Sequence, residues 1–302
     1  MIELCGVRLR GPVLNGSGTF DAIAARRAFG DALLHDFPFD AFVSKTITLA
    51  PRQGNPPPRL WESPSGLVNS IGLPNKGLKG FLAEDLPKLA KLRVPLIVSV
   101  MGFSRDELAM LVKTIGSRAE VAMIELNFSC PNVETGTVMG ADPAETAAAV
   151  ERLRPLTAKP LIVKLTPSAT DPTAVAAAAE EAGADSVSLI NTLRGMALDP
   201  RTRRPWLGGT TGGLSGPAVR PVALAQVAAV AERVSIPVIG MGGIASGRDA
   251  RDFLEVGASA IAVGTESFRD PAAGARIRRE LEALMPAPTE PEAARPPVPA
   301  RG

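Results

Sequence analysis

A thiol flanked by two amides marks the first segment of this sequence that could do chemistry. Cys130 follows Asn127 by three residues and precedes Asn132 by two, in the run Asn-Phe-Ser-Cys-Pro-Asn. A thiol near positive charge favours its thiolate and can then act as a general base or nucleophile. We therefore expect Cys130 to be accessible and reactive. The other cysteine, Cys5, lies near a predicted N-terminal strand and fits the common case of a buried, unreactive thiol.

Amide, ammonium, hydroxyl or glycine groups follow nearly every short apolar run of the chain. Bringing lysines and asparagines together in one place is costly unless a ligand pairs with them. The pattern therefore predicts a ligand site, if the fold brings these run ends together. In chain order they are Asn15-Gly16-Ser17, Lys45-Thr46, Ser99, Asn127, Lys164, Asn191-Thr192, Gly242-Gly243 and Gly264-Thr265.

The elements that must position these groups are eight short apolar, β-branched runs, which predict strands. The runs are Pro12–Asn15, Ala41–Ser44, Pro95–Val100, Val121–Leu126, Leu161–Leu165, Ser186–Ile190, Pro237–Gly240 and Ala260–Val263. Helical segments lie between them, such as Asp106–Ile115, Pro143–Leu156, Pro172–Ala182, Pro217–Arg233 and Arg248–Val256. Alternating strands and helices imply a parallel sheet. Eight such units favour a closed (β/α)8 TIM barrel over an open sheet, and no GxGxxG turn follows the first strand.

A barrel of this kind carries its chemistry at the carboxyl ends of the strands, so the groups above would meet at one mouth. The glycine pairs Gly242-Gly243 and Gly264-Thr265 end the last two strands. The loops after these two strands commonly form a phosphate site, because glycine lets the backbone approach the phosphate closely. We expect a phosphorylated cofactor or substrate there.

Three connections are longer than a barrel requires and are expected to be functional loops or lids: Thr46–Lys76, Ser129–Asp142 and Thr192–Ser215. The segment from Pro286 holds six prolines in seventeen residues and shows no apolar periodicity. We therefore predict one catalytic domain over residues 1–285 and a disordered tail over 286–302.

Composition excludes several classes of protein. The 302 residues include 33 basic and 31 acidic side chains, and only 4% are aromatic, with no tyrosine. A near-neutral charge argues against nucleic acid as a main partner, and few aromatics argue against base stacking. Two cysteines and one histidine, His35, are too few for an iron–sulfur cluster or a thiolate zinc site held by this chain alone, and we expect no metal site. The sequence shows no signal peptide and no membrane-length apolar run, so we expect a soluble cytoplasmic protein.

Several motifs together resemble class 1 dihydroorotate dehydrogenases, the FMN enzymes of pyrimidine synthesis. The resemblance runs from about Leu4 to Leu284 and is closest to the class 1B catalytic subunit. The motifs shared with class 1 are residues 127–132, Ser44-Lys-Thr-Ile-Thr48, Asn69-Ser-Ile-Gly-Leu73, Val163-Lys-Leu-Thr-Pro167, Gly212-Gly-Leu-Ser-Gly-Pro-Ala218 and Ile239-Gly-Met-Gly-Gly-Ile244. Those that point to class 1B are Thr46-Ile-Thr-Leu49, Gly54-Asn-Pro-Pro-Pro-Arg59, Gly140-Ala-Asp-Pro143 and Asn191-Thr-Leu-Arg-Gly-Met196.

The resemblance implies hydride transfer from C6 of dihydroorotate to N5 of FMN, with Cys130 as the base that removes the C5 proton to give orotate. It implies substrate binding by Lys45, Asn69, Ser70, Ile71, Gly72, Leu73, Asn127, Asn132, Asn191 and Thr192. It implies FMN binding by Ser17, Lys45, Thr46, Ser99, Asn127, Lys164, Ile190, Gly216, Gly242, Gly243, Gly264 and Thr265. These residues include most of the strand ends identified above.

The sequence departs from the expected pattern in two places. Ser99 stands where the family commonly carries an asparagine that contacts the flavin, and the run Gly72–Asn75 is closer to the fumarate-using class 1A. Class 1B enzymes pass electrons to NAD through a second subunit that carries FAD and a [2Fe–2S] cluster. This chain lacks a dinucleotide motif and the thiols for that cluster, so the resemblance implies such a partner. A homodimer, or a heterotetramer with that subunit, is expected.

Four alternatives compete with this interpretation. A class 1A homodimer would reduce fumarate directly. A dihydrouridine synthase-like flavoprotein would act on tRNA, which the near-neutral charge disfavours. A Schiff-base aldolase would use Lys164 or Lys45 and would lack a yellow cofactor. A non-catalytic binding barrel is the fourth.

Overall fold

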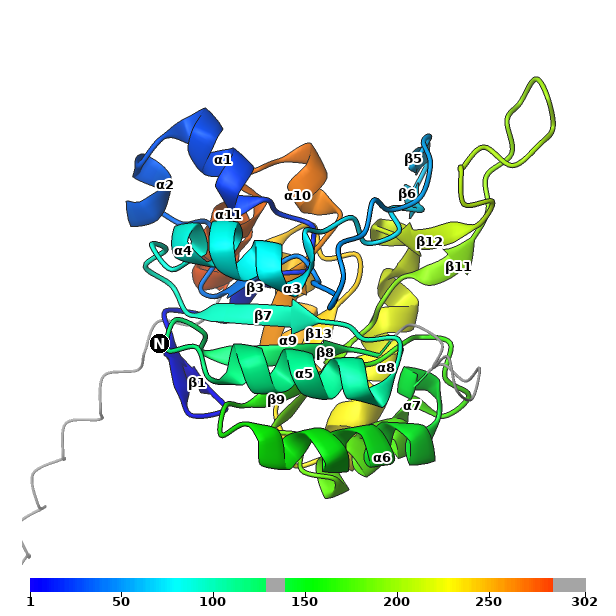
Figure 1. The fold of residues 1–302 in the computed structure, drawn as a ribbon. Helices are drawn as coiled ribbons and strands as arrows, with labels where there is room; N and C mark the ends of the chain where they lie inside the picture. Colours follow the sequence, from blue (N-terminus) through cyan, green and yellow to red (C-terminus); the bar gives the residue numbers. More distant parts are fainter. Residues whose placement is uncertain (129–138, 285–302) are drawn as a thin grey trace, which may run out of the picture.

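Eight parallel strands form a barrel surrounded by helices in the computed structural model, which describes residues 1–128 and 139–284 (Figure 1). The strands are, in chain order, β3 (Val13–Asn15), β4 (Phe42–Val43), β7 (Leu96–Val100), β8 (Met123–Asn127), β9 (Leu161–Lys164), β10 (Ser186–Leu189), β13 (Val238–Met241) and β14 (Ala260–Val263). They are paired in the order β3-β14-β13-β10-β9-β8-β7-β4. Each predicted run overlaps one strand, with bounds that differ by at most two residues. The predicted TIM barrel is confirmed.

Side chains close the barrel where β3 meets β4, because these two short strands share a single backbone bridge, Leu14 to Ala41. The buried Asn15 amide donates to the Val43 carbonyl (2.8 Å) and accepts from the Val43 N–H (2.8 Å). Asp40 accepts from the Val13 N–H (3.0 Å) in the same way. The expectation that Asn15 belongs to the ligand site is therefore wrong: its amide replaces missing ladder bonds.

Replacing Asn15 with alanine is expected to lower the free energy of unfolding by about 2–4 kcal/mol, because both backbone groups of Val43 lose a buried partner. Urea unfolding followed by circular dichroism measures this change. A matched variant, Ser117→Ala, removes one exposed hydroxyl contact and should change stability by less than about 0.5 kcal/mol. Equal effects of the two changes would contradict the assigned role of Asn15.

A short antiparallel hairpin, β1 (Ile2–Leu4) and β2 (Val7–Leu9), packs Leu4 and Leu9 against the apolar side chains inside the barrel. Cys5 lies in the turn of this hairpin, where its Sγ donates to the Asp185 carbonyl (3.2 Å). Burial raises the pKa of the Cys5 thiol to about 11, and the charge of Asp185 adds to this effect. The surroundings of Cys5 agree with the expectation of an unreactive thiol.

The helices pack on the outer face of the barrel, and their starts follow local capping signals. Side chains of Ser104, Asp142, Asp171 and Ser246 accept hydrogen bonds from backbone N–H groups in the first turns of four of them. The helices that match the five predicted ones are α5 (Arg105–Gly116), α6 (Pro143–Leu153), α7 (Pro172–Glu181), α8 (Arg220–Arg233) and α9 (Gly247–Glu255). Short 3₁₀ turns over Met139–Ala141, Arg154–Leu156 and Pro217–Val219 precede or extend them.

Further helices are formed by residues 22–89 and 266–284. They are α1 (Ala22–Phe29), α2 (Ala32–His35), α3 (Gly77–Gly80), a π-helical turn over Phe81–Asp85, α4 (Leu86–Leu89), α10 (Glu266–Arg269) and α11 (Ala273–Leu284). His35 ends α2 and is exposed. Across residues 1–128 and 139–284, no helix has both the length and the apolar character of a membrane span.

Two of the long connections form a second sheet rather than separate loops. The connection after β4 contributes β5 (Leu60–Ser63) and β6 (Gly66–Asn69), and the one after β10 contributes β11 (Leu193–Gly195) and β12 (Gly212–Ser215). These strands pair antiparallel in the order β11-β12-β6-β5 and project from the barrel at the upper right of Figure 1. The expectation that these two connections are loops or lids is corrected here, because their strands pair with each other in a sheet. In the third connection, residues 129–138 lie outside the described residues, as does the tail from residue 285.

Candidate functional site

Four strand ends meet at the mouth of the barrel in one hydrogen-bonded set of side chains. Ser17 Oγ donates to the Ser44 carbonyl (2.8 Å) and lies 3.1 Å from Thr46 Oγ1. Thr46 Oγ1 lies 2.9 Å from Ser99 Oγ and accepts from Asn127 Nδ2 at 3.3 Å. The barrel thus joins residues that are far apart in sequence and that the resemblance implies as FMN ligands.

Two buried polar groups at this end of the barrel lack partners among the described residues. Asn127 Oδ1 is buried and makes no hydrogen bond within residues 1–128 and 139–284. Lys164 is 6% exposed, stands opposite Asn127 in the β8–β9 register, and forms no hydrogen bond or ion pair with the described residues. Leaving a buried amide oxygen and ammonium unpaired is unfavourable. The pair therefore indicates a place where a ligand completes the site.

Lys45 brings a second cation to the mouth, directly before Thr46. Its side chain is exposed, yet desolvation by the surrounding mouth residues lowers the pKa of its ammonium. The charge of Asp21 opposes this shift, whereas Arg59 reinforces it. An anionic group bound beside Lys45 would favour the charged ammonium and so would be attracted there.

The ends of β13 and β14 form a glycine-lined cavity. Gly216, Gly243 and Thr265 line it, and Thr265 Oγ1 donates to Ser215 Oγ (2.8 Å). Gly243 has φ +75°, and a side chain there would lie 2.8 Å from the Gly216 carbonyl, so only glycine fits. A Cβ at Gly264 would meet nothing closer than 3.8 Å, which leaves backbone open to a ligand. This shape and chemistry suit a phosphate.

The small sheet brings together the residues that the resemblance implies as substrate ligands. Asn69 ends β6 and donates from Nδ2 to the Gly213 carbonyl (3.1 Å). Gly213 also lies against Thr192, since a Cβ there would be 2.0 Å from Thr192 Oγ1. Asn191 follows β10 and accepts from the Thr192 N–H (2.8 Å).

The other residues that the resemblance implies as ligands are found next to the small sheet or the ends of the barrel strands. Ser70 is buried and accepts from Asn55 Nδ2 (2.8 Å), and Ile71, Gly72 and Leu73 follow it. The side chain of Ile190 is 3.2 Å from where a Cβ of Gly242 would stand. Cys130 and Asn132 lie outside the described residues. The other implied residues therefore fall into three groups: the hydrogen-bonded set at the strand ends, the glycine-lined cavity, and the small sheet with its flanking residues.

Sequence reasoning missed the two charged residues of the glycine-lined cavity, Glu266 and Arg269. Both lie on the short helix α10, one and four residues after Thr265. Their position just after a predicted phosphate loop is the only sequence signal that could have identified them.

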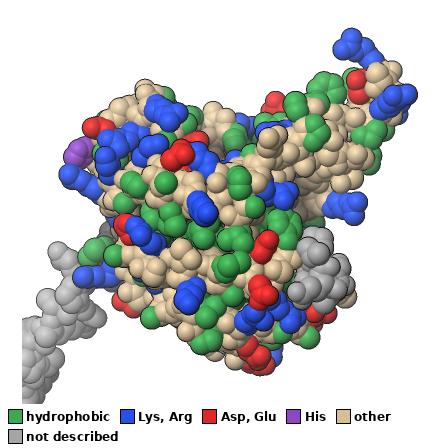
Figure 2. Space-filling view, in the orientation of Figure 1, with side chains coloured by type: hydrophobic (Ala, Val, Ile, Leu, Met, Phe, Trp, Pro, Cys, Tyr) green, Lys and Arg blue, Asp and Glu red, His purple; other side chains and the backbone are tan. Residues whose placement is uncertain are grey.

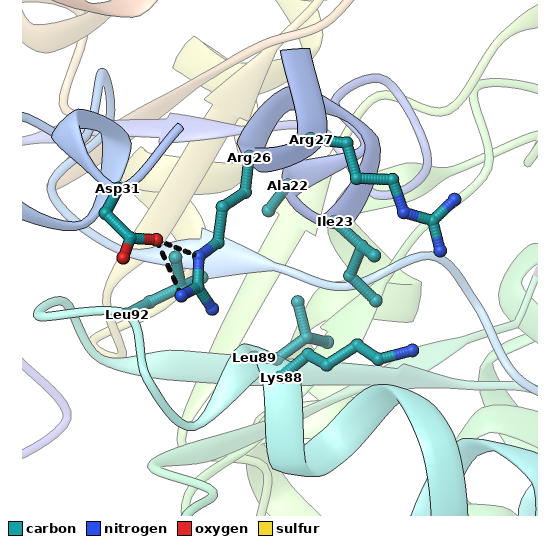
Figure 3. Close-up of a pocket in the computed structure, with 8 residues that line it drawn as sticks. All are labelled: Ala22, Ile23, Arg26, Arg27, Asp31, Lys88, Leu89 and Leu92. Atoms are coloured by element: carbon teal, nitrogen blue, oxygen red, sulfur yellow. Dashed lines mark hydrogen bonds and ion pairs between the residues drawn. The ribbon is translucent and has the colours of Figure 1, made fainter. Parts of the chain in front are cut away.

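A larger cavity, of about 300 Å³, lies outside the mouth between α1 and α4 (Figure 3). It is lined by Ala22, Ile23, Arg26, Arg27, Asp31, Lys88, Leu89 and Leu92, none of which is among the implied site residues. Arg26 pairs with Asp31 there (2.6 Å), and the charged ends of Arg27 and Lys88 extend away from that pair in Figure 3. The convergence of strand ends, and not cavity size, identifies the candidate active site.

Comparison with known proteins gives one consistent result. The family model of dihydroorotate dehydrogenase matches residues 1–285. A protein of Geobacter sp. strain M21 is 46% identical over 285 residues, which cover 94% of this chain and 92% of that protein. Proteins of Pelobacter propionicus (47% identical; 93% and 91% covered) and Desulforudis audaxviator (46%; 94% and 92%) are similar. All three are named dihydroorotate dehydrogenase B (NAD(+)), catalytic subunit.

Proposed function

The chain belongs to the dihydroorotate dehydrogenase family, and we propose that it is the catalytic subunit of a class 1B enzyme that oxidises dihydroorotate with FMN. The observation that carries the proposal is that Lys164 and Asn127 Oδ1 are buried at the ends of β9 and β8 with no partner among the described residues, while a glycine-lined cavity lies at the ends of β13 and β14 of the same barrel. A cofactor with one polar ring edge and one phosphate would satisfy both places.

The residues present fit FMN. Gly216, Gly243 and Thr265 would hold its phosphate, together with Gly242 and Gly264. Thr46 and Ser99, with Ser17 and Ile190, would border the ring. When bound, FMN supplies the hydride acceptor. The buried ammonium of Lys164 would stabilise negative charge on the ring.

The substrate would lie on the mouth side, between the barrel and the small sheet. The ammonium of Lys45 suits the carboxylate of dihydroorotate, because a charge-assisted hydrogen bond between them would offset the desolvation of the ammonium. Asn69, Asn127 and Asn191 offer amides for the ring N–H and C=O groups. We assign the remaining substrate contacts to Ser70, Ile71, Gly72, Leu73, Asn132 and Thr192.

Cys130 is the proposed base. In this role its thiolate takes the proton from C5 of dihydroorotate while the hydride leaves from C6, so that the ring gains one C=C bond. Support comes from the motif over residues 127–132. Asn127, at the start of that motif, lies at the mouth.

A partner subunit is part of the proposal. The similar proteins are named as NAD(+)-type catalytic subunits, and two cysteines in this chain cannot hold a [2Fe–2S] cluster. We place FAD and that cluster on the partner, and the whole assembly in the cytoplasm. Large apolar side chains of the small sheet and its neighbouring connection, Leu60, Met196 and Leu198, are 40–52% exposed. Hydrophobic side chains are visible on the part that projects at the upper right of Figure 2, which suits contact with a second copy in a homodimer or heterotetramer.

Anaerobic addition of dihydroorotate to the purified chain is expected to bleach the visible absorbance of its flavin rapidly, as followed in a stopped-flow instrument. A chain that carries FMN whose spectrum does not change would contradict the proposed substrate. A chain that purifies without flavin and binds none would contradict the proposed cofactor.

The bleached sample then distinguishes the subclasses. For class 1B, neither NAD⁺ nor fumarate alone should restore the yellow colour rapidly, and NAD⁺ should do so once the partner subunit is added. Rapid recovery with fumarate alone would favour class 1A, which the run Gly72–Asn75 resembles.

A further inference from the structure

Arg269 is the one positively charged residue among the described residues that line the cavity at the ends of β13 and β14. It extends from α10 and forms an ion pair with Glu62 of β5, at 3.2 Å. Both side chains are largely exposed, at 44% and 72%. Such a pair is weak and can be exchanged for a stronger one.

The other charged residue of the cavity, Glu266, is already neutralised. Arg276 donates to Glu266 (2.8 Å) and also contacts Asp270 (3.0 Å) and Glu280 (3.1 Å). Because Arg276 already pairs with three carboxylates, its positive charge is not available to a ligand. A phosphate placed in this cavity would therefore lie beside a carboxylate, with Arg269 as the cation within reach.

We propose that Arg269 binds the phosphate of FMN and gives up Glu62 when it does so. The inference rests on the proposed binding of FMN and adds a residue that determines specificity for the phosphorylated flavin. A guanidinium forms two parallel charge-assisted hydrogen bonds with phosphate oxygens, whereas the backbone N–H groups of Gly243 and Gly264 can donate only one each. The exchange links the phosphate to the small sheet, because Glu62 belongs to β5.

The test compares FMN with riboflavin, which has the same ring and no phosphate. Each flavin is titrated into the full-length chain freed of flavin, and binding is followed by the change in flavin fluorescence. For Arg269→Ala we expect the Kd of FMN to rise about 5- to 10-fold and the Kd of riboflavin to change less than about twofold. Arg269→Lys, which keeps the charge, should recover part of the FMN affinity.

Two further variants control the comparison. Glu62→Gln should tighten FMN by about twofold, because the competing carboxylate is gone, and leave riboflavin unchanged. Arg279→Ala, on the exposed side of α11, should change neither affinity. Unaltered FMN affinity in Arg269→Ala, or an equal loss for both flavins, would overturn the inference. A wild-type chain that binds neither flavin would instead refute the proposed function.

Discussion

Replacing Cys130 with alanine is expected to slow the reduction of bound FMN by dihydroorotate about 10²- to 10⁴-fold near neutral pH, with FMN still bound. The C5 proton then has no base positioned to accept it, although binding and hydride geometry remain. Anaerobic stopped-flow measurement of flavin bleaching gives the rate, and the flavin spectrum of the variant gives its FMN content. A wild-type rate in this variant would remove Cys130 as the base.

Cys5 supplies the matched control. Its thiol lies in the β1–β2 hairpin and donates to the carbonyl of Asp185, which directly precedes β10 at the opposite end of the barrel from the mouth. In Cys5→Ser, dihydroorotate should therefore reduce bound FMN at a rate within about twofold of wild type. Because its pKa is raised to about 11, Cys5 remains protonated at pH 8, so iodoacetamide should modify Cys130 first. Orotate should protect Cys130 and not Cys5.

Replacing Lys164 with methionine is expected to slow flavin reduction about 10²- to 10³-fold and to lower the midpoint potential of bound FMN. Methionine has a similar length and no charge, so the buried position stays filled while the positive charge beside the ring is lost. The potential is the decisive measurement, because a purely structural role of Lys164 would not change it. Equilibration with a reference dye during anaerobic reduction measures this potential.

Lys159 provides a control just before the same strand. It lies two residues before the start of β9, at the opposite end from Lys164. Lys159→Met should leave both the potential and the rate within about twofold of wild type. If Lys164→Met retained FMN at an unchanged potential, the proposed stabilisation of charge on the flavin would be wrong.

The sequence by itself determined the barrel and most of the groups at its mouth. Strands and helices in this fold have local signals: short β-branched runs, helix caps such as Ser104 and Asp171, and glycines where φ is positive. The carboxyl ends of parallel strands face one side. For this reason, the positions of Thr46, Asn127 and Lys164 in one site follow from their place at run ends alone.

Only the tertiary structure decided which groups act on each other. Asn15 has the same local signal as a ligand residue, yet it closes the barrel, because the partner that it needs is Val43 on a strand too short to pair fully. The small sheet joins residues 144 apart, Asn69 and Gly213, and no periodicity within either segment records that pairing. Arg269 lines the glycine-lined cavity together with Gly216 and Gly243, which are far from it in sequence. Contacts between distant segments depend on the packed chain as a whole, and local residue patterns do not contain them.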